Sequence, residues 1–154
     1  MNNVIKLSGF PEFLPQDKPA AFNSNSDIYF NVWERPCYFK GKDESYYEDP
    51  HHKHIVRTTN NGPVSIGLVG KNYKLLKNKD LCEGIEDTFM KCLTKEQLDG
   101  VTRRDSTSYM GGTCIRDYIF PSIRADIRGS RSDIAFRAIV INGYDGTCSF
   151  KFLH

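Results

Sequence analysis

The sequence lacks the features that would place the chain in or across a membrane. No run of about 18 apolar residues occurs among its 154 residues, which excludes a membrane-spanning helix. The N-terminus contains neither the charged region nor the apolar stretch of a secretion signal. We therefore expect a cytoplasmic protein with no membrane partner, and the length predicts one domain.

Paired cysteines are absent as well. The five cysteines are an odd number, they are scattered, and no two have the C-x-x-C spacing (Cys37, Cys82, Cys92, Cys114 and Cys148). This pattern is typical of reduced thiols in a cytoplasm, where most of them act as small core residues.

Short catalytic motifs are missing too. There is no G-x-G-x-x-G and no G-x-S-x-G sequence. Gly70-Lys71-Asn72 resembles the end of a P-loop, but Asn72 stands where Ser or Thr is required, and Ser65 stands where the first glycine should be. Nothing in the spacing singles out one thiol as a nucleophile. We therefore expect a binding protein rather than an enzyme.

Strand signals dominate the first half of the chain. Residues 27–33 are rich in strand formers, whereas 40–50 looks like a polar connection. Two further strands, at 54–58 and 64–69, flank Asn60-Asn61-Gly62, which is a good hairpin signal.

One helix is expected after these strands. Asn78 is its proposed N-cap, and apolar residues then recur every four positions as far as Leu93. Thr94 and Gln97 have the spacing of a capping box. Strands follow again near 109–120 and 133–142. This order predicts an α+β fold, with a mainly antiparallel sheet and one principal helix packed on one face.

The domain organisation is predicted to be simple. Residues 1–50 form an N-terminal arm and the first strands, packed on a main domain of residues 51–154. The last residues read as a strand that follows a Gly143–Gly146 turn, and a terminal strand leaves an open sheet edge. We expect either self-association through that edge into a homo-oligomer, or a longer natural protein that continues past His154.

Histidines form one cluster with the character of metal ligands. His52 and His54 would point the same way on an extended strand, with His51 and Asp49 beside them. A divalent metal is the only cofactor this pattern suggests, although zinc sites usually need three or four ligands. Adventitious metal affinity or a merely polar surface explains the cluster better than a dedicated metal site.

Positive charge is concentrated near the C-terminus. Residues 101–154 carry eight Lys or Arg against five Asp or Glu, and seven of the eight cations are arginine. Arginine suits bidentate contact with phosphate, so Arg124, Arg128 and Arg131 are candidates for a polyanion-binding face. The alternative is a solvated loop in which these arginines pair with Asp126 and Asp133.

Three blocks of sequence carry a family resemblance. The first runs from His54 to Asn78 and includes Arg57, Gly67, Val69 and Tyr73; the others are Asp105 to Pro121 and Asn142 to Ser149. In this order they resemble the phage/plasmid-like protein family, a domain of bacteriophage and plasmid genomes. Members normally continue into a Cys-x-Asn-Gly segment and a helical part, so the chain resembles an N-terminal portion.

The resemblance implies a role in phage DNA metabolism or counter-defence within an infected bacterium. We therefore expect a non-enzymatic module that binds DNA, another polyanion or a host factor. Its candidate nucleic-acid-binding residues are Arg116, Arg124, Arg128, Arg131 and Tyr144. One alternative is a metal-dependent hydrolase or nuclease that uses His51, His52 and His54. Another is a phage structural or assembly protein.

Overall fold

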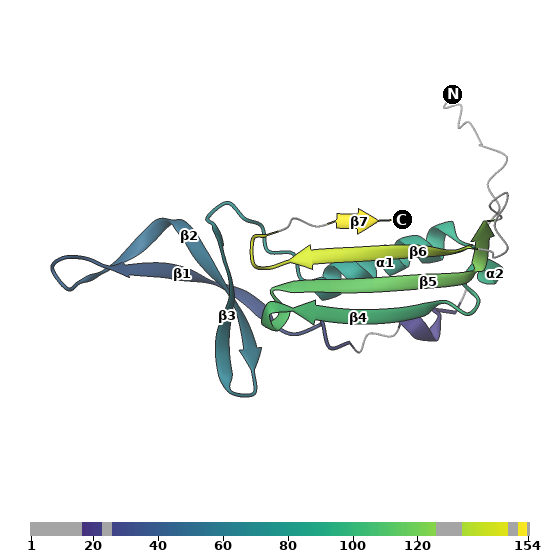
Figure 1. Ribbon diagram of the computed structural model, residues 1–154, viewed down its shortest axis with the longest axis horizontal. Coiled ribbons are helices and arrows are strands. Elements are labelled where there is room, and N and C mark those ends of the chain that lie inside the picture. The colour runs from purple at the N-terminus through teal and green to yellow at the C-terminus, as the bar shows by residue number, and fades with distance from the viewer. Residues whose placement is uncertain (1–16, 23–25, 126–133, 148–150, 154) are drawn as a thin grey trace, which may run out of the picture.

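The computed structural model describes residues 17–22, 26–125, 134–147 and 151–153. It contains a three-stranded sheet, here called sheet A, with the order β1-β2-β3, and a four-stranded sheet, sheet B, with the order β4-β5-β6-β7. Both sheets are antiparallel, and one main helix, α1, packs against sheet B (Figure 1). The predicted α+β fold is confirmed.

Sheet A is built from two hairpins. Its strands are β1 (Val32–Lys40), β2 (Tyr46–Thr59) and β3 (Gly62–Gly70). The predicted hairpin turn is confirmed: β2 ends at Thr59, β3 begins at Gly62, and Gly62 has a φ of 105°, which suits glycine. The first hairpin extends beyond β3, because β3 pairs with β2 only from His52 onward.

The extent of β1 and β2 differs from the prediction. The first strand was expected at 27–33, but β1 runs from Val32 through Pro36 to Lys40; the expected polar connection at 40–50 instead contributes Tyr46–Pro50 to β2. Both expectations were wrong for a physical reason. Pro36 is tolerated because β1 is an edge strand. The tip of the β1–β2 hairpin is stabilised by stacking between the rings of Phe39 and Tyr47. Local sequence patterns do not reveal such a cross-strand contact.

Two helices connect the sheets. α1 (Asn78–Cys92) is followed by α2 (Lys95–Leu98), and Thr94 and Gln97 form the predicted capping box on α2. The predicted N-cap of α1 was wrong, since Lys77 occupies that position. Asn78 is the first helical residue, and its side chain is buried and bonded elsewhere. None of the helices in the described part of the chain is long and apolar enough to cross a membrane.

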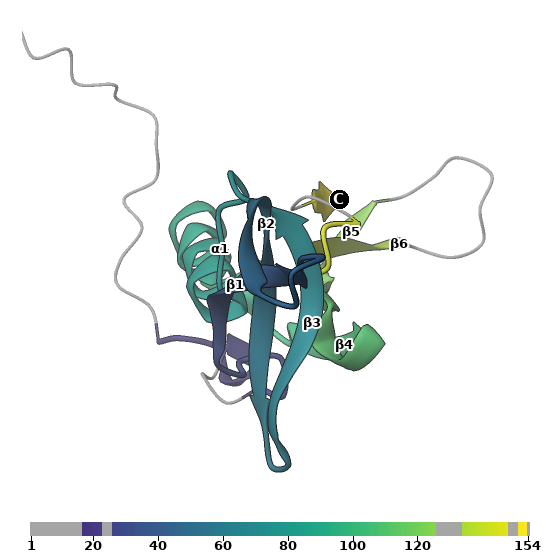
Figure 2. The same ribbon diagram turned by 90° about the vertical axis from the view of Figure 1, so that its left-hand side faces the viewer.

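Sheet B comprises β4 (Thr102–Ser108), β5 (Thr113–Ala125), β6 (Ile134–Gly143) and β7 (Lys151–Leu153). The strand β6 lies inside the sheet, between β5 and β7. The helix-side residues of β5 are buried: Cys114, Arg116, Tyr118 and Phe120. Short helical turns precede β1 and β5, namely η1 (Ala20–Phe22) and η2 (Tyr109–Gly111). Figure 2 shows α1 on one side of the strands.

Two groups of buried residues form the core. One lies between α1 and sheet B, where the Phe89 ring meets Tyr118 at 5.3 Å and Phe120 at 5.1 Å between centroids. The other joins sheet A to the start of α1 and to sheet B, and contains Ile55, Ile66, Cys82, Cys114 and Tyr144. The boundary drawn at residue 50 falls inside β2, which pairs with β1 on both sides of it.

Candidate functional site

Residues that carry the family resemblance meet at the junction of the two sheets. Tyr144 is 1% exposed, and its hydroxyl accepts a hydrogen bond from the backbone N–H of Asn78 at 2.8 Å. The Asn78 amide donates to the Ile28 carbonyl at 2.9 Å and accepts from Asn142 at 2.8 Å. Tyr73 donates to the Gly143 carbonyl at 2.9 Å. These residues therefore hold the two sheets together, and we call their hydrogen-bonded cluster the joint.

Tyr144 is consequently a core residue. Burial raises the pKa of its phenol, so that the group stays a neutral hydroxyl. Its ring lies edge-on to Phe30, with 6.0 Å between centroids. The structure thus places this predicted nucleic-acid contact inside the protein, where its ring offers no face to a base.

Arg116 is also enclosed. Its side chain is 0% exposed and lies between the carboxylates of Asp105 and Glu86. The guanidinium donates to both Asp105 oxygens at 2.8 and 2.9 Å, and to Glu86 at 3.1 Å. The Tyr118 hydroxyl donates to the same Glu86 oxygen at 2.9 Å. Arg116 is therefore an internal counter-ion and does not face a phosphate at the surface.

This ionic cluster also fixes the N-terminal segment. The Lys18 ammonium lies 3.3 Å from Glu86, and the Ser26 hydroxyl donates to Asp105 at 2.5 Å. Burial alone would raise the pKa of the Asp105 carboxyl, but the hydrogen bonds and charge of Arg116 outweigh it, and the pKa lies below its usual value. Against the effect of burial, the hydrogen bonds to Asp105 also raise the pKa of Arg116, so this pair stays ionised.

The buried thiols are not suited to nucleophilic chemistry. Desolvation is the main reason that the pKa of Cys82 rises to about 11, and that of Cys114 also rises to about 11. Both groups stay protonated near neutral pH, whereas the thiolate is the reactive form. We therefore assign these thiols to the core.

The histidine cluster lies at a bulge of β2. The register between β1 and β2 shifts between Pro36 and Tyr38, opposite residues 49–52 of β2. One Asp49 oxygen accepts from the His51 backbone N–H at 2.7 Å, and the other lies 2.9 Å from the His52 ring nitrogen. The His54 ring instead lies 2.9 Å from the Ser65 hydroxyl.

Asp49 thus contacts both His51 and His52, whereas His54 contacts Ser65 on β3. Among the residues that the structure describes, no group of three His, Cys, Asp or Glu side chains is arranged to hold a metal ion. Backbone hydrogen bonding from His51 is the main reason that the pKa of Asp49 falls below its usual value. A metal site at His51, His52 and His54 stays a prediction.

Arg124 lies at the surface beside an apolar cleft. Between Phe120 and Arg124 the register of β5 against β6 shifts, and β5 bends away from the plane of sheet B (Figure 1). The cleft beyond this bulge has a volume of about 360 Å³, and is lined by Ile123, Arg124, Ala125, Ile134, Ala135, Phe136 and Arg137. The Arg124 Nε donates to the Pro121 carbonyl at 2.9 Å.

Arg128 and Arg131 lie outside the described residues, in the segment 126–133 that connects β5 to β6. Arg137, which the sequence did not single out, is half exposed and binds Asp117 through two hydrogen bonds. The only signal in the sequence that the Arg137 side chain faces outward was its position between Phe136 and Ala138, which face inward.

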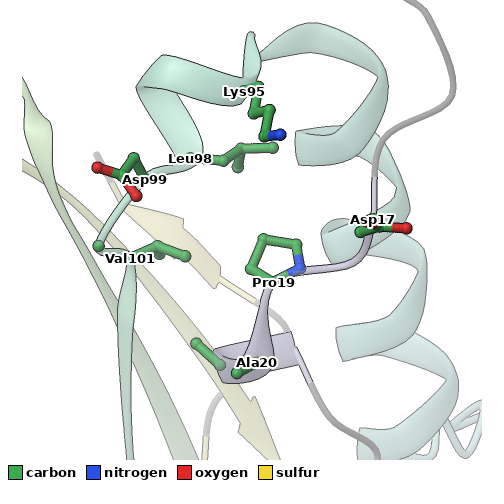
Figure 3. A pocket seen from close by; sticks show the side chains of 9 residues that line it. Asp17, Pro19, Ala20, Lys95, Leu98, Asp99 and Val101 are labelled. Carbon is green, nitrogen blue, oxygen red and sulfur yellow. The ribbon is translucent and has the colours of Figure 1, made fainter.

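A second cleft, of about 320 Å³, separates η1 from the α2–β4 turn (Figure 3). Pro19, Ala20, Leu98 and Val101 supply its apolar walls, and it also contacts Asp17, Lys95 and Asp99. The two carboxylates and the single amine give it no dominant charge and no reactive pair, so we assign it no ligand.

Comparison with known proteins adds no assignment to this geometry. No family model, no curated protein and no solved structure matches the chain. The resemblance to the phage/plasmid-like family therefore stays a prediction from sequence.

Proposed function

We propose that this protein is a non-enzymatic, phage-derived module that binds single-stranded nucleic acid at the β5–β6 cleft. The cleft volume of about 360 Å³ lies within the range that accommodates small aromatic groups. Its walls are apolar, apart from Arg124 and Arg137. An unstacked base fits apolar walls, and its phosphates fit the adjacent arginines. This combination is the observation that carries the proposal.

A single strand is favoured over a duplex because bases in a duplex are already stacked and cannot enter a cleft. Arg128 and Arg131 follow Arg124 in sequence and add positive charge to the same connection. The proposed location is the cytoplasm of an infected bacterium, which accords with the resemblance and with unpaired cysteines. The proposed partners are therefore DNA or another polyanion.

The test is fluorescence anisotropy with a labelled single-stranded oligonucleotide and its duplex, between 50 and 200 mM salt. We expect micromolar single-strand binding that weakens with salt, with a slope of about −2 for three phosphate contacts. Arg124→Ser should weaken binding by about 5- to 10-fold and reduce the slope by roughly one contact. Replacing Arg124, Arg128 and Arg131 together should abolish salt-sensitive binding.

Lys79→Ser is the matched control. Lys79 is an exposed cation on α1, and its loss lowers the net charge by the same amount as Arg124→Ser. It should leave the affinity unchanged. No binding by the parent protein at the lowest salt, or equal losses in the two variants, would remove the proposal.

A further inference from the structure

The hairpin tip of sheet A is an exposed aromatic ribbon. We call residues 37–49 the β1–β2 arm; it has no third strand beside it and projects away from sheet B (Figures 1 and 2). Four of its side chains are 47–73% exposed, namely Tyr38, Phe39, Tyr46 and Tyr47. Residues that lie opposite each other on the two strands share one face of the hairpin. Phe39 pairs with Tyr47 on one face, and Lys40 pairs with Tyr46 on the other. Aromatic side chains therefore project from both faces.

The hairpin gains little stability while its aromatic side chains remain exposed to water. A two-stranded hairpin is only marginally stable in water, and it cannot bury rings that point to both sides. Tyr47 does make local contacts, since its hydroxyl donates to Asp43 at 2.6 Å. Fully buried aromatic side chains remove about 150–250 Å² each from water, so the four half-exposed rings offer roughly 400 Å².

The outer face of sheet B, opposite α1, is the second unpartnered surface. Four partly exposed isoleucines form adjoining rows across β5 and β6, where an antiparallel sheet usually presents polar residues to water. They are Ile115, Ile119, Ile139 and Ile141. No described element lies over this face in Figure 1.

This face carries positive charge. Asp117 is its only carboxylate among the described residues of β4, β5 and β6, and Arg137 already binds it. Exposed Arg104 lies opposite Asp117 on β4 and adds a further cation. By contrast, the arm has two lysines and four carboxylates, a formal charge of −2 (Lys40, Lys42, Asp43, Glu44, Glu48 and Asp49).

We infer that the β1–β2 arm of one copy docks on the outer face of sheet B of a second copy. Tyr38 and Tyr46, which share one face of the arm, cover the isoleucines, and the acidic arm meets the arginines of the sheet face. The arm of a given chain points away from its own sheet B, so the contact forms only between molecules (Figure 1). The rings of Tyr38 and Tyr46 supply roughly 250 Å², about a third of what each partner usually contributes to a stable interface.

The inferred contact is heterologous, because two different surfaces meet. Head-to-tail contacts of this kind produce rings or open filaments, whose size rises with concentration unless the ring closes. The parent protein should therefore have a mass above the 17.6 kDa of one chain in sedimentation velocity. This inference is independent of the nucleic-acid proposal and leaves Arg124 unchanged.

Two kinds of variant separate the two surfaces. The arm variant is Tyr38→Thr/Tyr46→Thr, and the face variant is Ile115→Thr/Ile139→Thr; threonine keeps the strand preference at all four positions. Each variant alone should sediment as a monomer of 17.6 kDa. Mixed in equal amounts they should form a dimer, because one supplies an intact face and the other supplies an intact arm.

The controls make each outcome decisive. Tyr109→Asn removes a ring that is 78% exposed outside the arm, at a positive φ that asparagine tolerates, and should assemble like the parent. Arg104→Glu is a second face variant if Ile115→Thr/Ile139→Thr fails a far-ultraviolet circular dichroism check. A monomeric parent overturns the inference. Assembly that neither variant affects would indicate pairing through β7, and assembly that only the arm variant abolishes would indicate arm-to-arm contact.

Discussion

At the scale of single residues, the role of Arg116 and Asp105 follows from the burial of their ion pair. They lie opposite each other on neighbouring strands, and α1 adds Glu86 from above the sheet. Removing one partner of a buried ion pair typically costs about 3–5 kcal/mol, because the remaining charge has no counter-ion. The cluster thus stabilises the fold, and its charges are unavailable to an external ligand.

The environment of Asp105 predicts that the folded protein loses stability in acid. Its pKa is lowered in the folded state, so its stabilising effect is fully present above the unfolded pKa of about 3.9 and is lost as the pH falls through the folded pKa. We expect Asp105→Asn to be less stable than the parent at pH 6, and its free energy of unfolding to change less between pH 5 and pH 3.

Urea unfolding at several pH values measures this effect. Asp87→Asn, which neutralises an exposed carboxylate on α1, should retain the slope of the parent. An unchanged slope in Asp105→Asn would show that this carboxylate does not carry the acid sensitivity.

Single residues also show how far sequence reasoning reaches. Arginine and tyrosine suit phosphates and bases, so Arg116 and Tyr144 were reasonable candidates. Both lie on the α1 side of sheet B, and only the strand register and the helix position determine which side that is. Arg124 was placed correctly at the surface, because the arginine-rich connection around it is polar.

At the scale of elements, local patterns predicted local structures. The helix stripe, the capping box and the Asn60–Gly62 turn each depend on neighbours within a few residues, and each formed as expected. The strands β1 and β2 depend on cross-strand contacts such as Phe39 with Tyr47, which no short sequence window contains.

Gly67 on β3 shows how tightly these elements meet. A Cβ at this position would lie 2.0 Å from the Tyr144 carbonyl oxygen, a backbone atom that cannot move without opening the joint. We expect Gly67→Ala to lower the free energy of unfolding by about 1–3 kcal/mol or more. Urea unfolding of Gly70→Ala is the control, since a Cβ there meets nothing within 4 Å. Equal stability of the two variants would contradict the close packing at Gly67.

At the scale of the whole molecule, the joint around Tyr144 predicts that the two sheets unfold together. Cys82, Cys114 and Tyr144 come from α1 and the sheet B region, yet pack with Ile55 and Ile66 of sheet A. Trp33 on β1 is the only tryptophan and monitors sheet A, whereas circular dichroism at 222 nm monitors chiefly α1. Their urea transitions should coincide.

An earlier Trp33 transition would show that sheet A unfolds by itself. Tyr144→Phe is a useful comparison, because it removes the hydroxyl that binds Asn78 while retaining the ring. If the joint couples the sheets, this variant should separate the two transitions or lower both midpoints equally.

The sequence by itself determined the α+β class, the main helix, the hairpin turn and the surface position of Arg124. These features follow from residue periodicity, turn chemistry and local polarity. Only the tertiary structure decided that Arg116 and Tyr144 are buried, that His54 contacts Ser65 while His51 and His52 contact Asp49, and that the β1–β2 arm is exposed. Those outcomes depend on which distant segments pack together, because burial and ion pairing arise from contacts between residues far apart in the chain.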